Sequence, residues 1–98
     1  MGSSHERRVD VGALRYAAEF LRILPSDIPE PDIVIEEDGE VAFDWDVSRR
    51  ATFSVSVGPD GTLRYGGLFG RRTRYGSVQL TSSIPPDILS LIAKVGES

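Results

Sequence analysis

Residues 53–65 read Phe-Ser-Val-Ser-Val-Gly-Pro-Asp-Gly-Thr-Leu-Arg-Tyr, and this stretch decides the fold. Before the turn, apolar residues alternate with serines, which is typical of a strand with one buried face. Residues that pair across a hairpin must share a face. A three-residue turn with Gly61 in the left-handed conformation satisfies this rule, because it pairs Val57 with Leu63. The stretch therefore predicts an antiparallel hairpin.

A second hairpin of the same kind precedes the first. Residues 33–36 and 41–46 again alternate apolar and polar positions, and Asp38-Gly39 stands between them. A two-residue turn would place acidic side chains opposite apolar ones. A three-residue turn with Gly39 left-handed places apolar residues opposite one another. We therefore expect Gly39 and Gly61 to share a conformation with positive φ.

A short loop joins the two hairpins. Three residues, Ser48-Arg49-Arg50, place Trp45 opposite Phe53 on the same buried face. Because three consecutive registers agree on one face, they predict a four-strand antiparallel meander with Trp45 in its core. The fourth strand continues to Phe69, and Gly66-Gly67 marks a bulge or a close backbone approach in mid-strand.

Beyond the meander, the sequence predicts one more strand and a helix. A loop, Gly70-Arg71-Arg72-Thr73-Arg74, leads to a fifth strand over residues 75–81. Ser82 or Ser83 then caps a short helix that Pro85-Pro86-Asp87 opens. Helical spacing points four apolar residues inward, namely Ile88, Leu89, Ile92 and Val95.

A longer helix precedes the sheet. Asp10 suits the N-cap position, and Pro25 stops the helix at about Leu24. Helical spacing predicts an inward stripe of Val11, Leu14, Ala17, Ala18, Leu21 and Leu24, with a second apolar ridge of Tyr16, Phe20 and Ile23. The predicted fold class is α+β: an N-terminal helix, an antiparallel four- to five-stranded β-meander and a short C-terminal helix, with the helices on one face of the sheet.

Length and composition bound the domain organisation. A chain of 98 residues is long enough for one domain and too short for two. We assign residues 10–96 to a single α+β domain and residues 1–9 to a tag remnant or a disordered N-terminus. The chain has no apolar stretch of membrane-helix or signal-peptide length, so we expect a cytoplasmic protein without a membrane partner.

The side-chain inventory leaves little for catalysis. The chain has no cysteine, and its one histidine, His5, falls in the tag-like segment. We therefore expect no enzyme, no cofactor and no metal, since triads and histidine metal sites are excluded. One alternative stays open, because Asp44 and Asp46 share a strand face and could support acid/base chemistry or hold a hard cation. The acidic run 36–40 lacks the spacing of a calcium loop.

Charge is segregated along the chain. The net charge is −4, yet six arginines and only one acidic residue, Asp60, lie between Arg49 and Arg74. Eight acidic residues and no basic one lie between Glu30 and Asp46. The two groups could offset one another across a solvated sheet face, or they could polarise the surface and orient a partner.

The most concentrated cationic and aromatic feature follows the fourth strand. Arg71, Arg72 and Arg74 stand beside Tyr75. Such a segment could contact nucleic-acid phosphates or a carboxylate patch on a protein. The candidate partner-binding residues are therefore Arg71, Arg72, Arg74, Tyr75, Asp44 and Asp46.

Four motifs together resemble a group of small bacterial proteins of phage or mobile-element type. They are a helix ending in Leu24-Pro25, a Pro29-Glu30-Pro31 strand start, an Asp38-Gly39 turn leading to Trp45, and the Phe53–Val57 strand. The group has no assigned activity, so the resemblance implies the fold and no function. Its members tend to carry His-Gly at Tyr75-Gly76 and an N-terminal Trp-Asp-Gly segment that this sequence lacks.

The sequence thus favours a non-enzymatic protein-interaction module of bacterial or phage type, such as an inhibitor, an antitoxin-like regulator or an assembly factor. A domain that contacts nucleic acid through residues 71–74 is the first alternative. An enzyme or a cation site at Asp44 and Asp46 is the second.

Overall fold

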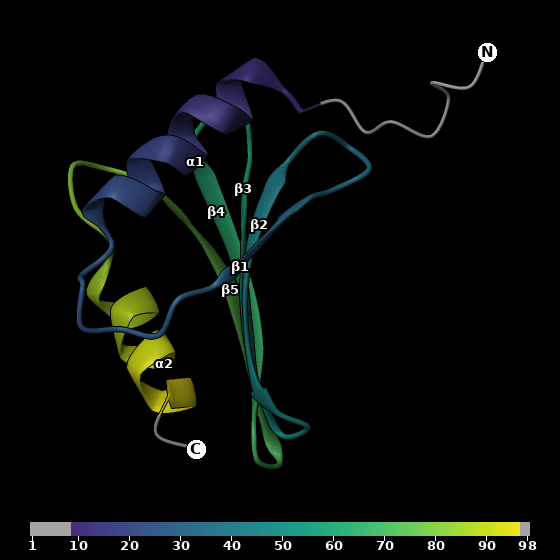
Figure 1. Ribbon diagram of the computed structural model, residues 1–98, viewed down its shortest axis with the longest axis vertical. Coiled ribbons are helices and arrows are strands. Elements are labelled where there is room, and N and C mark those ends of the chain that lie inside the picture. Colours follow the sequence, from purple (N-terminus) through teal and green to yellow (C-terminus); the bar gives the residue numbers. More distant parts are fainter. Residues whose placement is uncertain (1–8, 97–98) are drawn as a thin grey trace.

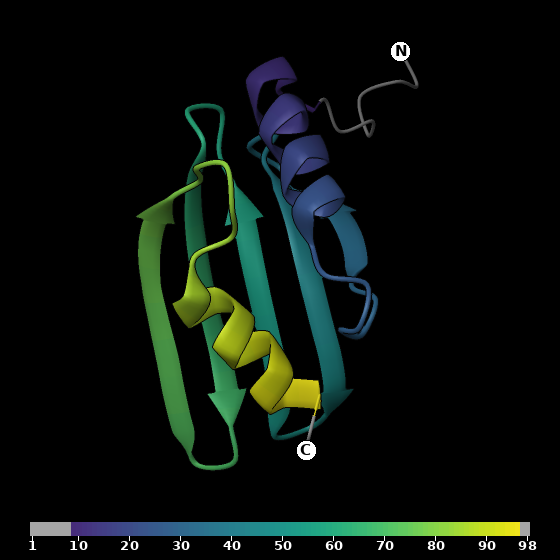
Figure 2. The same cartoon turned by 90° about the vertical axis from the view of Figure 1, so that its left-hand side faces the viewer.

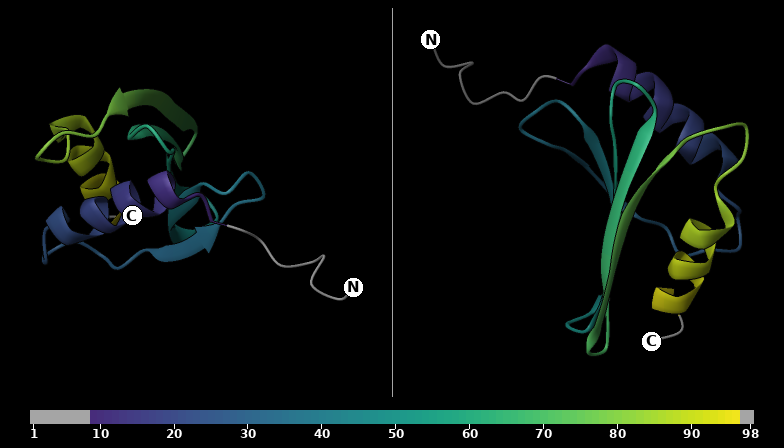
Figure 3. Two further views of the ribbon diagram at one scale, coloured as in Figure 1. Left: turned by 90° about the horizontal axis from the view of Figure 1, so that it is seen from above. Right: turned by 180° about the vertical axis from the view of Figure 1, so that it is seen from behind.

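Five antiparallel strands form one sheet in chain order, and two helices pack on one of its faces (Figure 1). This computed structural model describes residues 9–96. The elements are α1 (Val11–Ile23), β1 (Asp32–Ile35), β2 (Val41–Ser48), β3 (Ala51–Val57), β4 (Thr62–Phe69), β5 (Arg72–Gln79) and α2 (Pro86–Gly96). Both helices lie in front of the sheet in Figure 2, and Figure 3 shows its twist from above and from behind. The predicted α+β meander is confirmed.

The two Asp-Gly turns have the predicted geometry. Gly39 and Gly61 have φ angles of 89° and 84°. An aspartate stabilises each turn, because Asp38 and Asp60 each accept a hydrogen bond of 3.0 Å from the backbone N–H two residues later. The registers of β1 with β2 and of β3 with β4 match the predicted apolar pairs.

The turn between β2 and β3 differs from the prediction. The expected pair of Trp45 and Phe53 is present, but the turn has two residues, Arg49 and Arg50, instead of three. Val47 is an extra residue on β2, because the register shifts there. A two-residue turn with a one-residue bulge gives the same face pairing as a three-residue loop, so the face rule could not separate them.

The prediction of a loop over residues 70–74 is wrong. Gly70 and Arg71 alone join β4 to β5, and β5 begins at Arg72 and ends at Gln79, earlier than predicted at both ends. Gly70 has a φ of 68° at the first turn position, as in a type II′ hairpin, whose twist suits the flanking strands. Residues 72–74 therefore extend the sheet, because each of them finds a partner on β4.

The core lies between the sheet and the helices. Its largest fully buried side chains include Trp45, Phe20, Phe43, Phe53, Leu63, Ile88 and Ile92. Trp45 is 2% exposed, as predicted, and its Nε1 donates a hydrogen bond of 2.8 Å to the Pro29 carbonyl oxygen. The predicted close approach occurs at Gly67, where an added Cβ would lie 2.7 Å from the Thr52 carbonyl oxygen. The strand pairing runs through Gly66 and Gly67 without a bulge.

The buried face of α1 is not the predicted stripe. The buried residues are Ala13, Ala17 and Phe20, whereas the exposed ones include Val11, Leu14 and Leu21. The small alanines allow the helix to approach the sheet, and Phe20 packs on Phe43 with ring centroids 4.9 Å apart. The contact is therefore made by a face between the two predicted ridges, with Ala17 from the first and Phe20 from the second, and Leu14 and Leu21 lie beside it.

The helix starts agree only in part with the prediction. Asp10 caps α1, with its Oδ1 accepting a hydrogen bond of 3.1 Å from Ala13 N–H. α2 begins at Pro86, directly after Pro85, so neither Ser82 nor Ser83 occupies its cap. The residues that α2 buries, Ile88, Ile92 and Val95, are those predicted, and Leu89 is half-buried.

The N-terminal boundary of the domain lies at or before Val9. Val9 packs against the core, and the neighbouring Asp10 N–H donates to the Gly39 carbonyl at 2.9 Å. Residues 1–8, which include His5 and most of the segment assigned to a tag or a disordered terminus, lie outside the described residues.

Candidate functional site

The topology sorts the charges of the chain to two opposite ends of the sheet. Successive turns of a meander alternate between its ends, so the β1–β2 and β3–β4 turns share one end and the β2–β3 and β4–β5 turns share the other (Figures 1 and 2). We name the first the acidic end, formed by Asp10, Glu36, Glu37, Asp38, Glu40 and Asp60. We name the second the basic end, formed by Arg49, Arg50, Arg71 and Arg72.

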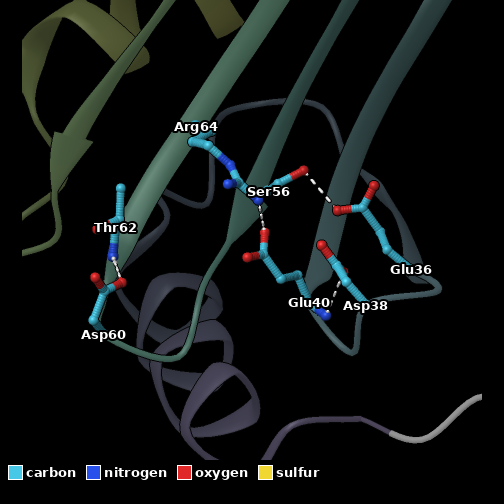
Figure 4. Close-up of polar contacts among 7 residues, drawn as sticks. All are labelled: Glu36, Asp38, Glu40, Ser56, Asp60, Thr62 and Arg64. Carbon is cyan, nitrogen blue, oxygen red and sulfur yellow. Dashed lines mark hydrogen bonds and ion pairs between the residues drawn. The ribbon is translucent and has the colours of Figure 1, made fainter.

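Five of the six carboxylates of the acidic end accept a hydrogen bond within the domain, and Glu37 is the exception among these described residues (the turn contacts are drawn in Figure 4). Glu36 accepts a hydrogen bond of 2.8 Å from the Ser56 hydroxyl, and Glu40 forms an ion pair with Arg64. Oxygens of Glu36, Asp38 and Glu40 lie within 4.8 Å of one another, a proximity that sequence reasoning missed. Because each of the three carboxylates already has a partner in the domain, the cluster belongs to the hydrogen-bonded structure of the turn.

Asp60 has a lowered pKa at the same end. The backbone N–H of Thr62 donates to its carboxylate, and this hydrogen bond stabilises the charged form, with a smaller contribution from Arg64. Asp60 is exposed, so the effect is that of a surface turn rather than of a buried acid.

Two adjacent turns of the sheet build the basic end. Gly70 N–H donates a hydrogen bond of 2.7 Å to the Arg50 carbonyl oxygen, which ties the β4–β5 turn to the β2–β3 turn. All four arginines of the basic end are exposed. Within residues 9–96, none of these arginines forms an ion pair with a carboxylate. The basic end is therefore a fixed group of cations with no anionic partner in the described part of the chain.

The predicted cationic segment divides between the two faces of the sheet. Arg72 and Arg74 lie opposite Phe69 and Gly67, so their side chains lie on the helix-bearing face. Tyr75 lies on the other face and is 83% exposed. Arg71 is in the turn. The four residues thus contribute to one edge and one end of the sheet, and they do not form a single loop.

The two candidate carboxylates, Asp44 and Asp46, lie on the helix-free face of β2. Asp44 is half-buried and accepts a hydrogen bond of 2.5 Å from the Ser54 hydroxyl, whereas Asp46 is exposed opposite Thr52. Among residues 9–96, the carboxylate group of cation-binding size is the one at Glu36, Asp38 and Glu40, and neither Asp44 nor Asp46 belongs to it. The structure therefore brings no third histidine, cysteine or carboxylate to this pair from the described residues.

Sequence reasoning also missed a groove beside β5. α2 packs on β2, β3 and β4 but not on β5, and a cavity of about 390 Å³ lies between this helix and the sheet edge. Its walls include Tyr65 of β4, Arg74 of β5 and Lys94 of α2. The Tyr65 ring lies over Gly76, where an added Cβ would be 2.7 Å from the tyrosine hydroxyl. The glycine opposite an aromatic residue was the signal available in the sequence.

Neither protein-family models, nor curated proteins, nor solved structures gave a match to this chain. The resemblance to small bacterial proteins therefore stays a prediction. No helix within residues 9–96 has the length and apolar character needed to span a bilayer.

Proposed function

We propose that this domain is a non-enzymatic protein-interaction module that binds an acidic surface of a protein partner through its basic end. The observation that carries the proposal is a group of four exposed arginines, three on two tied turns and Arg72 at the start of β5. None of them is paired with a carboxylate of the described chain. An inhibitor, an antitoxin-like regulator or an assembly factor of bacterial or phage type would use such a surface.

The geometry suits recognition of carboxylates. Guanidinium groups present a planar fork of donors that matches a carboxylate, and turns held by a sheet fix the backbone positions from which these side chains extend. The strands run along the longest dimension of the molecule, 44 Å. Because the Debye length is about 8 Å at physiological ionic strength, the acidic end does not neutralise the basic end. The resulting dipole orients an approaching acidic partner.

Nucleic acid is the second candidate ligand, since the same arginines could contact phosphates. The net charge of −4 and the acidic end disfavour a long polyanion, which would extend past the basic end. A cation-dependent enzyme at Asp44 and Asp46 is the third candidate. Its support is limited to the shared strand face of these two residues.

The test compares two double charge reversals. The variant R50E/R71E brings the net charge of the four basic-end positions from +4 to zero. R15E/R22E makes the same change of net charge on the exposed side of α1, where it also removes the exposed ion pair between Arg22 and Glu19. The partner is captured from the native host by cross-linking, purified, and its association rate with each variant is measured over a range of salt concentrations. A labelled DNA duplex and a labelled RNA strand serve as parallel probes.

We expect R50E/R71E to slow association with the protein partner by about tenfold or more at low salt and to flatten the salt dependence, because steering by charge is lost. R15E/R22E should associate at the wild-type rate. Equal rates for both variants would overturn the proposal. Salt-dependent binding of DNA or RNA that only R50E/R71E loses would replace it with the nucleic-acid function.

A further inference from the structure

The free edge of β5 gives the proposed module a specific way to hold its partner. We propose that an extended acidic segment of the partner adds to the sheet as a sixth strand beside β5, with alternate acidic side chains in the groove against α2. This inference rests on the proposed function, and it names the chemistry of the segment that is bound.

The backbone of β5 is suited to strand addition. All eight of its residues pair with β4 without a register shift, so its far side presents a regular row of N–H and C=O groups. β5 is the last strand of the sheet, and no proline interrupts it. Main-chain hydrogen bonds to such an edge supply affinity, and pockets for alternate side chains supply specificity.

The helix-bearing side of β5 is open to those side chains. α2 does not cover β5, and the cavity of about 390 Å³ reaches the strand at Arg74 and Tyr75. Gly76 carries no side chain there, and Tyr65 lies across it as one wall of the cavity. Every second side chain of an added strand would point to the helix-bearing side, since strand side chains alternate between the two faces, and the one beside Arg74 would enter the cavity.

The charges of the groove select acidic side chains. Arg74 lines the groove from β5, and Arg72 lies on the same side of that strand outside the groove. Lys94 and one carboxylate, Asp87, line the groove from α2, but Lys94 Nζ already lies 5.8 Å from the centroid of the Phe69 ring, so the two arginines carry the selection. These cations oppose addition of a basic or purely apolar strand, including the β5 edge of a second copy. Acidic residues at alternate positions of the added strand would instead form ion pairs with these cations.

The opposite side of the added strand would meet a different environment. Tyr75 lies on the helix-free face and is 83% exposed, so a cross-strand neighbour there would pack on its ring. The segment that fits therefore alternates acidic residues, which face the groove, with apolar residues, which face Tyr75.

The experiment uses synthetic peptides with the intact domain. The probe is a fluorescent peptide that alternates Glu and Val over the length of β5, and a Lys-Val peptide is its control. Two further versions of the probe carry N-methyl groups on every second amide, one on the Glu amides and the other on the Val amides. Fluorescence anisotropy gives the dissociation constants, and amide hydrogen exchange reports on β5. Sedimentation of the free domain shows whether a second copy occupies the edge.

Strand addition predicts that one N-methylated version loses binding and the other keeps it, because only alternate amides of an added strand face β5. It also predicts that the Lys-Val peptide does not bind and that β5 amides gain protection. R74E should weaken binding of the Glu-Val peptide by about tenfold or more. Y75S should weaken it by a few fold, and R15E, which makes the same charge change on α1, should leave it unchanged.

Equal binding of both N-methylated versions without protection of β5 would overturn strand addition and leave an electrostatic contact at the basic end. The same conclusion follows if the natural partner depends on Arg50 and Arg71 while no probe peptide binds. A self-associated domain with a protected β5 would assign the edge to a second copy and overturn the inference. Strand addition that survives in a partner complex insensitive to R50E/R71E would refute the proposed function alone.

Discussion

The acidic end and the basic end are built from the same kind of tight turn, yet they use charge in opposite ways. At the acidic end, Glu36 and Glu40 bind Ser56 and Arg64, and the turn aspartates accept backbone N–H groups. At the basic end, no carboxylate of the described residues meets an arginine. Charge that is bound internally belongs to the structure of the turn. Charge that is held in place without a partner is available to another molecule.

The largest expected effect tests whether one rigid sheet joins the two ends. Trp45 of β2 is buried, its ring lies 5.9 Å from that of Phe53, and its Nε1 is bound to the Pro29 carbonyl. W45A should therefore lower the free energy of unfolding by about 3–5 kcal/mol. V47A, at an exposed position of the same strand, should change it by less than about 0.5 kcal/mol. Urea unfolding measures both variants. A small effect of W45A would mean that the two ends do not depend on a common core.

The next prediction compares one glycine from each end. Gly61 and Gly70 both have positive φ, so alanine at either position should cost about 1 kcal/mol. Only at Gly61 would the added Cβ meet a side chain, because the Tyr16 ring lies 2.9 Å away, whereas nothing lies within 4 Å at Gly70. G61A should therefore be the more destabilising change in thermal and urea unfolding. The reverse order would show that the turns of the basic end are the tighter ones.

A smaller effect on stability is expected when a charged side chain with a partner is compared with one that has none. E40Q removes the ion pair with Arg64, and it should lower stability by about 0.2–1 kcal/mol, because the arginine is largely exposed. R71Q should leave stability unchanged within error, since Arg71 has no carboxylate partner in the described chain. The double mutant E40Q/R64Q closes the cycle and isolates the pair. A larger loss in R71Q than in E40Q would contradict the comparison between the ends.

The smallest effect depends on pH. Asp60 has a folded-state pKa below its unfolded value of about 3.9, so the folded state binds fewer protons in that range. Its contribution to stability is present above the unfolded pKa and is lost as pH falls through the folded pKa. The difference in the free energy of unfolding between the wild type and D60N should therefore shrink as the pH falls. NMR titration of the Asp60 carboxyl measures the pKa itself, and a value above that of the unfolded chain would reverse the sign.

The parts of the fold that were predictable are those where one residue type excludes the alternatives. Gly39 and Gly61 fixed their turns, because only a left-handed residue let apolar side chains share a face. The β2–β3 turn was not predictable, since a bulge at Val47 gives the same pairing as a longer loop. The face of α1 was ambiguous because both of its apolar ridges have helical spacing. The buried face takes Ala17 from one ridge and Phe20 from the other, together with Ala13, which belonged to neither.

The sequence predicted which residues belong to the candidate site, but it did not predict how they are arranged in space. Composition alone singled out Arg71, Arg72 and Arg74, but the expected loop would have made them one flexible group. The type II′ turn at Gly70 instead divides them between the end and the edge of the sheet. The pairing of Arg49 and Arg50 with this turn, and the groove beside α2, depend on contacts between residues distant in the sequence. Local pattern carries no information about such contacts.

The bulge at Val47 also bears on how the domain avoids aggregation during folding and storage. β1 covers β2 only as far as Asp44, so the second half of β2 is an uncovered edge with the apolar Val47 in it. A regular edge of this kind is a template for amyloid-like growth. The extra residue twists the backbone at the uncovered segment and interrupts its row of hydrogen-bonding groups. Deleting Val47 to regularise the strand would therefore convert a protected edge into a nucleation site for aggregation.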